Sequence, residues 1–98
     1  MASMRTVRFE TQVRYWNPEK ASGLAVADIP AEHHAALGGL RQQRVAGTVN
    51  GAAFVSNVMP AGGGRLALSI SKAIQQAAAV GIGSALSVDI TAIGPDAG

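Results

Sequence analysis

The chain has 98 residues and a mass of 9.9 kDa, which corresponds to one small domain and excludes a multidomain enzyme. Apolar residues make up 48% of the sequence, but 19 of these are alanine, so about 28 larger apolar side chains remain to fill a core. The core is therefore expected to be small and mostly solid, which weighs against an internal active site. Eight basic and six acidic residues give a net charge of +2, and their scattered positions argue against a nucleic-acid-binding surface.

The chain contains no cysteine, which excludes disulfides, thiolate nucleophiles and cysteine metal ligands. No apolar run has the length of a signal peptide or a membrane span, so we expect a soluble, cytoplasmic protein without a membrane partner. Residues 1–5 are expected to be a disordered N-terminus or an added segment, with residues 1–3 then standing ahead of a native Met4. A single domain is predicted over residues 6–93, followed by a frayed tail at 94–98.

The first third of the chain predicts two strands and a helix. Apolar and polar residues alternate over residues 6–16, which is typical of a half-buried strand. Residues 17–23 form a loop by their Asn-Pro and Gly signals, and residues 24–29 predict a second strand. Pro30 ends that strand, and a short helix over residues 31–37 is expected to follow.

The middle of the chain carries a strong hairpin signal at Asn50-Gly51. Both residues tolerate the positive φ that a type I′ turn requires, so strands are predicted over residues 45–50 and 52–58. The proline and glycines of residues 60–64 predict a loop.

The last third repeats the order of strand, helix, glycine and strand. Residues 66–70 predict a strand, and Ser71 is placed to cap a helix over residues 72–80 that Gly81 ends. Residues 86–90 predict the final strand. The repeated order suggests two similar β-α-β halves that close one barrel, which would leave no strand edges exposed. The predicted fold is therefore mainly β with two short helices, in a small closed six-stranded barrel.

The sequence holds no recognisable catalytic or metal-binding motif. The glycines at 62–64 join two strands, whereas a phosphate loop opens a helix. His33 and His34 are neighbours and do not share a helix face, whereas helical metal ligands normally lie four residues apart. No serine lies in a nucleophile elbow. We therefore name no catalytic residue, no metal ligand and no cofactor.

The candidate binding residues begin with Ser71 and Lys72 at the predicted helix start. A lysine is electrostatically unwelcome at the positive end of a helix, and beside a serine it would suit an anion, although a solvent-exposed lysine is the simpler interpretation. Trp16 would either close one end of the barrel or offer a surface on which a ligand stacks. Arg44 and Arg65 complete the set of candidate binding residues.

The hairpin at residues 45–54 reads Val-Ala-Gly-Thr-Val-Asn-Gly-Ala-Ala-Phe, and the helix start reads Lys72-Ala73-Ile74. With these stretches in this order and spacing, the chain resembles the DUF1905 family over nearly its whole length. The resemblance implies a double-split β-barrel, similar to the AbrB-like DNA-binding barrels, in which one chain supplies both halves. It also implies bacterial relatives and no established activity. The chain departs from the family pattern at Gln75 and Gln76, where an arginine is usual.

The sequence thus predicts a small binding module without catalysis of its own, which takes a small anionic ligand or a protein partner. One alternative is a nucleic-acid-binding protein, by fold analogy with the AbrB-like barrels. A second alternative is a small enzyme with a pocket at the barrel mouth. Because a closed barrel hides its own edges, a monomer or a weak dimer is expected.

Overall fold

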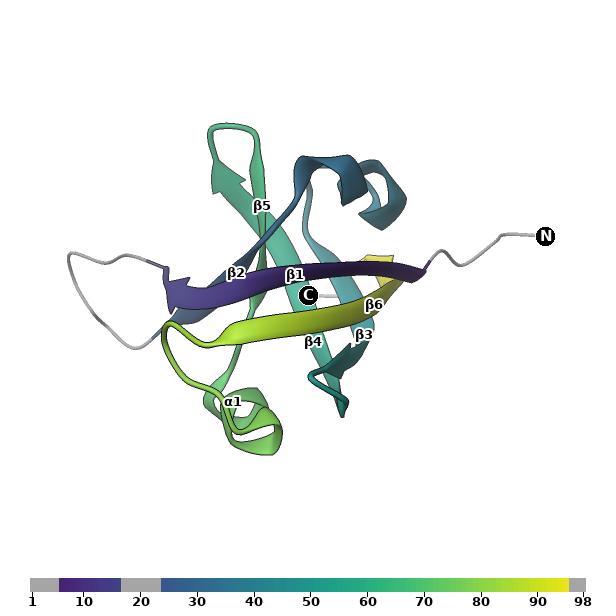
Figure 1. Ribbon diagram of the computed structural model, residues 1–98. Coiled ribbons are helices and arrows are strands. Elements are labelled where there is room, and N and C mark those ends of the chain that lie inside the picture. The colour runs from purple at the N-terminus through teal and green to yellow at the C-terminus, as the bar shows by residue number, and fades with distance from the viewer. Residues whose placement is uncertain (1–5, 17–23, 96–98) are drawn as a thin grey trace.

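The computed structural model describes residues 6–16 and 24–95, which form a closed antiparallel barrel (Figure 1). Around the barrel the strand order is β1-β2-β5-β4-β3-β6, and β6 pairs with β1 to close it. The strands are β1 Thr6–Tyr15, β2 Ala25–Ile29, β3 Gln43–Val49, β4 Ala52–Gly62, β5 Arg65–Ser69 and β6 Ala85–Pro95. The predicted fold, a mainly β closed six-stranded barrel, is confirmed. Residues 1–5, the predicted loop at 17–23 and residues 96–98 lie outside the described part.

The barrel has an approximate internal two-fold symmetry in its connectivity. Exchanging β1, β2 and β3 for β4, β5 and β6 reproduces the same set of strand pairings. In each half, a helical segment connects the second strand to the third. The two halves meet where β2 pairs with β5 and where β3 pairs with β6. The repeated order of elements in the sequence therefore corresponds to two matching halves.

The helical segments are shorter than predicted. Instead of a helix over residues 31–37, the chain forms two 3-10 turns, η1 Ala31–His33 and η2 Ala35–Leu37. A segment this short gains few helical hydrogen bonds, and Gly38 ends it with a φ of 92°. The helix α1 spans Lys72–Ala78, and Ala79 ends it in the left-handed conformation, so Gly81 is not its terminator. The turns and α1 lie on opposite sides of the barrel (Figure 1).

The Asn50-Gly51 hairpin is confirmed, with φ of 49° and 85° at its two turn residues. The predicted loop at 60–64 is wrong at its start, because β4 continues to Gly62 and the turn is confined to two glycines. Pro60 fits within β4 because pairing with β3 ends at Val58, so its missing N–H interrupts no bond on that side. The predicted frayed tail also begins too early, since residues 94 and 95 belong to β6 and pair with β3.

The barrel interior is filled by apolar side chains that alternate along the strands. Leu37 and Ile74 reach this core from the 3-10 turns and from α1, so the helical segments contribute to the same packed interior. The buried cluster contains Val7, Phe9, Val13, Ala25, Ala27, Ile29, Leu37, Val45, Val49, Phe54, Val58, Leu66, Leu68, Ile70, Ile74, Leu86, Val88 and Ile90. The prediction of a mostly solid interior agrees with this packing.

Gly47 lies where β3 comes closest to β6. A Cβ atom at this position would overlap the carbonyl oxygen of Asp89 and lie 2.9 Å from the Cα atom of Ile90. The close approach of two backbones therefore requires glycine here. This explains physically the glycine of the Val-Ala-Gly-Thr stretch in the hairpin.

Candidate functional site

Two of the residues predicted from the sequence lie at the start of α1. The Ser71 hydroxyl accepts a hydrogen bond from the Ile74 backbone N–H at 3.2 Å, which confirms the predicted cap. Lys72 is exposed as the first residue of a helix of only seven residues. Trp16 lies on the same side of the barrel, because its N–H donates to Leu24 and the neighbouring Ile70 N–H donates to Ala25.

The two arginines of the predicted set lie elsewhere. Arg65 begins β5, at the opposite end of that strand from Ser71, and its Nε donates to the Gly62 carbonyl oxygen at 3.3 Å. Arg44 is exposed on β3, opposite Asn57 of β4. The structure therefore brings Trp16 and the helix start to one end of the barrel, and it does not join them with the arginines in one site.

A depression of about 500 Å³ lies on the outer side of the barrel, where β1 passes β2 and the start of β6. Its lining is mixed but mainly polar: Glu10, Thr11, Gln12, Val13, Arg14, Asp28 and Ala85. Strand alternation positions these groups. Val7, Phe9 and Val13 of β1 pack in the core, so the alternate residues Glu10, Gln12 and Arg14 project outward along one line.

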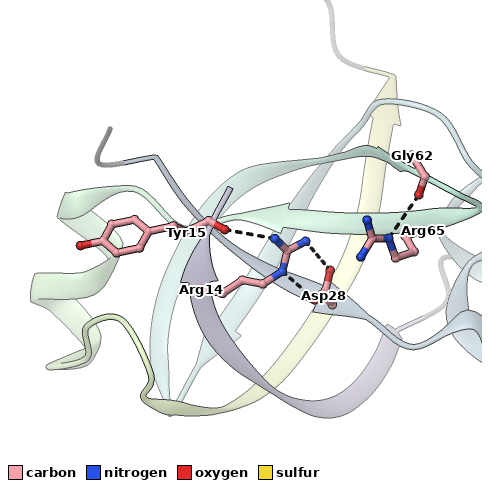
Figure 2. A network of polar contacts seen from close by, with 5 residues as sticks. All are labelled: Arg14, Tyr15, Asp28, Gly62 and Arg65. Atoms are coloured by element: carbon pink, nitrogen blue, oxygen red, sulfur yellow. Dashed lines mark hydrogen bonds and ion pairs between the residues drawn. The ribbon is translucent and has the colours of Figure 1, made fainter. Parts of the chain in front are cut away.

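Arg14 and Asp28 form a bidentate ion pair across the β1–β2 hairpin (Figure 2). The Arg14 Nε donates to Oδ2 at 2.7 Å and its Nη2 donates to Oδ1 at 2.8 Å. The Nη1 atom donates to the Tyr15 carbonyl oxygen at 3.1 Å, so three of the five guanidinium N–H groups are used. The pair is held in a planar, two-bond geometry that fixes the position of both side chains.

The hydrogen bonds from Arg14 lower the pKa of Asp28 below its ordinary value, and the positive charges of Arg14 and Arg65 act in the same direction. Partial burial opposes this shift. Figure 2 shows the Arg14 guanidinium between Tyr15 and Asp28, with Arg65 beyond the carboxylate. Asp28 therefore remains ionised and paired with Arg14 at neutral pH.

Sequence reasoning did not identify Arg14 and Asp28 as site residues. The partner of Arg14 lies 14 residues away in the sequence, on the next strand. The alternation of β1 signals which residues face outward. Which of them faces Asp28 depends on the register of β1 against β2, and the sequence of residues 17–23 does not reveal that register.

Three other side chains, Arg8, His33 and His34, have defined partners. Arg8 pairs with Asp89 across β1 and β6 at 2.6 Å. The His33 ring stacks on Phe9 with centroids 5.6 Å apart, and the His34 Nε2 atom hydrogen-bonds the Ile29 carbonyl oxygen at 2.9 Å. In the described ranges there is no group of three or more side chains that could hold a metal ion, and no helix that could span a membrane.

Comparison with known proteins identifies one family. A family model described as "Domain of unknown function (DUF1905)" matches residues 9–90, which includes β2 to β5 entirely, most of β1 and the first part of β6. No curated protein and no solved structure matches the chain. Because the family match spans most of the sequence, the chain belongs to the DUF1905 family.

Proposed function

We propose that this barrel is a non-catalytic binding domain whose site is the outer depression of β1 and β2, and that it takes a lysine or arginine side chain of a protein partner. The observation that carries the proposal is the charge of the lining. Two carboxylates, Glu10 and Asp28, face one guanidinium, Arg14, so the depression has a net charge of −1.

Glu10 is the group that would recognise the partner's cation. Asp28 is already engaged by Arg14, whereas Glu10 is exposed and forms no ion pair with another described residue. The unused N–H groups of Arg14 can donate to a carbonyl oxygen next to the incoming side chain. A cationic side chain on a peptide backbone therefore fits both features of the depression.

The strands support this function because they hold the lining residues rigidly. Glu10 lies in the middle of β1, which pairs with β6 at this point, and Asp28 is fixed by its two bonds to Arg14. A site on paired strands loses little conformational entropy when it binds. Of the two partners predicted from the sequence, the protein partner suits this site better than the anionic ligand, because an anion would meet two carboxylates.

The test is a titration of the ¹⁵N-labelled domain with two short peptides, one rich in lysine and one with glutamate at the same positions. We expect the lysine peptide to shift the backbone amide signals of residues 10–14, 28 and 85. Glu10→Gln should weaken its binding about fivefold, since an exposed ion pair contributes up to ~1 kcal/mol. Glu32→Gln, which removes an exposed carboxylate from η1, is the matched control and should bind as the wild type does.

Equal binding of the two peptides would contradict the proposal, as would a Glu10→Gln variant with unchanged affinity. Because exposed ion pairs are screened by salt, the lysine peptide should also bind more weakly as ionic strength rises.

A further inference from the structure

The outer face of β3, β4 and the end of β6 differs in chemistry from the depression. Val55 of β4 is 50% exposed and Ile93 of β6 is 45% exposed. Ala46 of β3 pairs with Val55 on one side and with Thr91 on the other, and Ile93 lies two residues beyond Thr91 along β6. Val55, Ala46 and Ile93 therefore stand on the same outer face of the sheet. We call the outward residues of this region, Arg44, Ala46, Ala53, Val55, Asn57 and Ile93, the β3–β4 face.

Alternation along β6 explains why Ile93 points outward, because Ile90 is buried and Ala92 faces the core. The β3–β6 ladder shifts between Arg44 and Val45, so that Val45 pairs with Ala92 and Arg44 with Gly94. Ile93 is the extra residue of this bulge, while Ala92 packs against the core. Large apolar side chains that stand exposed together on one face of a sheet can mark a surface that contacts another molecule.

The charge on this face is limited to one cation. Arg44 is exposed and forms no ion pair with another described residue, and it lies opposite Asn57 in register. The Oδ1 atom of Asn57 is buried and has no hydrogen-bond partner among the described residues. Along β3 and the strands beside it, the nearest carboxylate is that of Asp89, which already forms an ion pair with Arg8. Indeed, the sequence contains no acidic residue between Glu32 and Asp89.

We propose that the β3–β4 face binds an extended segment of a second partner protein that carries apolar side chains followed by a carboxylate. The apolar side chains would cover Val55, Ala46 and Ile93, and the carboxylate would accept hydrogen bonds from the Arg44 guanidinium. This surface is separate from the depression, so the proposal does not rest on the function proposed above.

Charge complementarity favours this occupant over two others. A second copy of the chain, docked by the same face, would bring another Arg44 and no free carboxylate, which leaves both guanidinium groups unpaired. A nucleic acid would require several cations along its backbone, whereas this face offers one.

The experiment uses the acetylated and amidated peptide Ser-Leu-Ser-Leu-Ser-Glu-Ser and its counterpart with Lys in place of Glu. In an extended peptide, the two leucines and the glutamate lie on one side at the spacing of Ala53, Val55 and Asn57 along β4. We expect the Glu peptide to shift the amide signals of β3, β4 and residues 91–94 of the ¹⁵N-labelled domain, and to bind about tenfold more tightly than the Lys peptide.

Three variants make the test specific. Arg44→Glu should reverse the preference, so that the Lys peptide binds more tightly than the Glu peptide. Val55→Thr keeps a β-branched residue and should weaken the binding of both peptides equally. Lys72→Glu makes the same charge change at an exposed position outside the face and should leave the preference unchanged.

Equal binding of the two peptides, or signal shifts confined to residues 10–14, would overturn the proposal. It would also be overturned if duplex DNA shifted the β3–β4 face more strongly than the Glu peptide does. Concentration-dependent shifts of this face without peptide, insensitive to Arg44→Glu, would instead identify a second copy as the occupant and exclude the proposed segment.

Discussion

Strands β1 and β4 occupy equivalent places in the two halves of the barrel, yet their outer surfaces differ in charge. β1 projects Arg8, Glu10 and Arg14 outward, whereas β4 contains no charged residue over its whole length. Both strands place large apolar side chains in the core. The symmetry of the barrel thus constrains the inward residues, since they must fill one shared interior, and leaves the outward residues free to diverge. Divergence of this kind gives one small domain two surfaces of different chemistry.

The two helical segments show a similar divergence. Gly38 ends η2 and Ala79 ends α1, and both adopt the left-handed conformation, with φ of 92° and 56°. Glycine adopts this conformation without steric cost, whereas alanine is strained there. The same backbone requirement is met with strain in only one half.

The largest expected effect concerns the scaffold that both halves share. Gly47→Ala would force its Cβ into the Asp89 carbonyl oxygen, where β3 meets β6, so the free energy of unfolding should fall by about 3 kcal/mol or more. Urea denaturation measures this loss. Gly81→Ala is the control, because a Cβ there meets no atom within 4 Å, and its stability should stay within about 0.5 kcal/mol of the wild type. Similar losses in both variants would refute the close approach.

The next largest loss of stability is expected when the side chains that reach the core from the two helical segments are shortened. Leu37 is fully buried and Ile74 is 8% exposed. Leu37→Ala should therefore lower the free energy of unfolding by about 3 kcal/mol. Ile74→Ala should lower it by about 2 kcal/mol, because the cavity that it leaves is less completely enclosed. Thermal and urea unfolding of both variants test the order. A larger loss for Ile74→Ala would show that the second half depends more strongly on its helix.

A smaller, pH-dependent effect should distinguish the charged surface of β1 and β2 from the uncharged β4. The folded-state pKa of Asp28 is lowered, so its contribution to stability is present above the unfolded value of about 3.9 and is lost as pH falls through the folded value. Asp28→Asn should cost up to ~1 kcal/mol at pH 7, because the pair is partly exposed and screened. The difference between this variant and the wild type should shrink toward pH 2.

Urea denaturation at pH 7, 4 and 2 provides the measurement. Arg14→Gln removes the donor of both bonds and should show the same reduced dependence on pH. A difference between Asp28→Asn and the wild type that stays constant with pH would contradict the assigned cause.

The smallest effect should come from Ala79. Ala79→Gly relieves the left-handed strain but loses some conformational entropy, so the free energy of unfolding should rise by about 0.5 kcal/mol. The reciprocal change, Gly38→Ala, should destabilise the domain, because its φ is 92° and its Cβ would overlap the Gln43 amide. Differential scanning calorimetry of the two variants measures the expected gain of stability in Ala79→Gly and the expected loss in Gly38→Ala. A loss of stability in Ala79→Gly would show that no strain is stored at this position.

Much of the fold could be predicted because its signals are local. The alternation of β1, the Asn50-Gly51 turn and the Ser71 cap each depend on a few adjacent residues. The errors fall where an element depends on its neighbours. Pro60 suggested a loop, but β4 accepts it because β3 pairing has already ended. Far less of the candidate site could be predicted, since Ser71 proved to be a helix cap and Arg14 found its partner across a hairpin of unknown register.

The sequence by itself determined a single small barrel of six strands, two matching halves and a solid apolar interior. It did so because hydrophobic periodicity and turn residues depend only on short stretches of the sequence. Only the tertiary structure decided which outward groups meet. The pairing of Arg14 with Asp28, the depression beside Glu10, and the outer face that holds Val55 and Ile93 all join different strands. Their positions follow from register and barrel closure, which are set by packing of the whole core and not by any local segment.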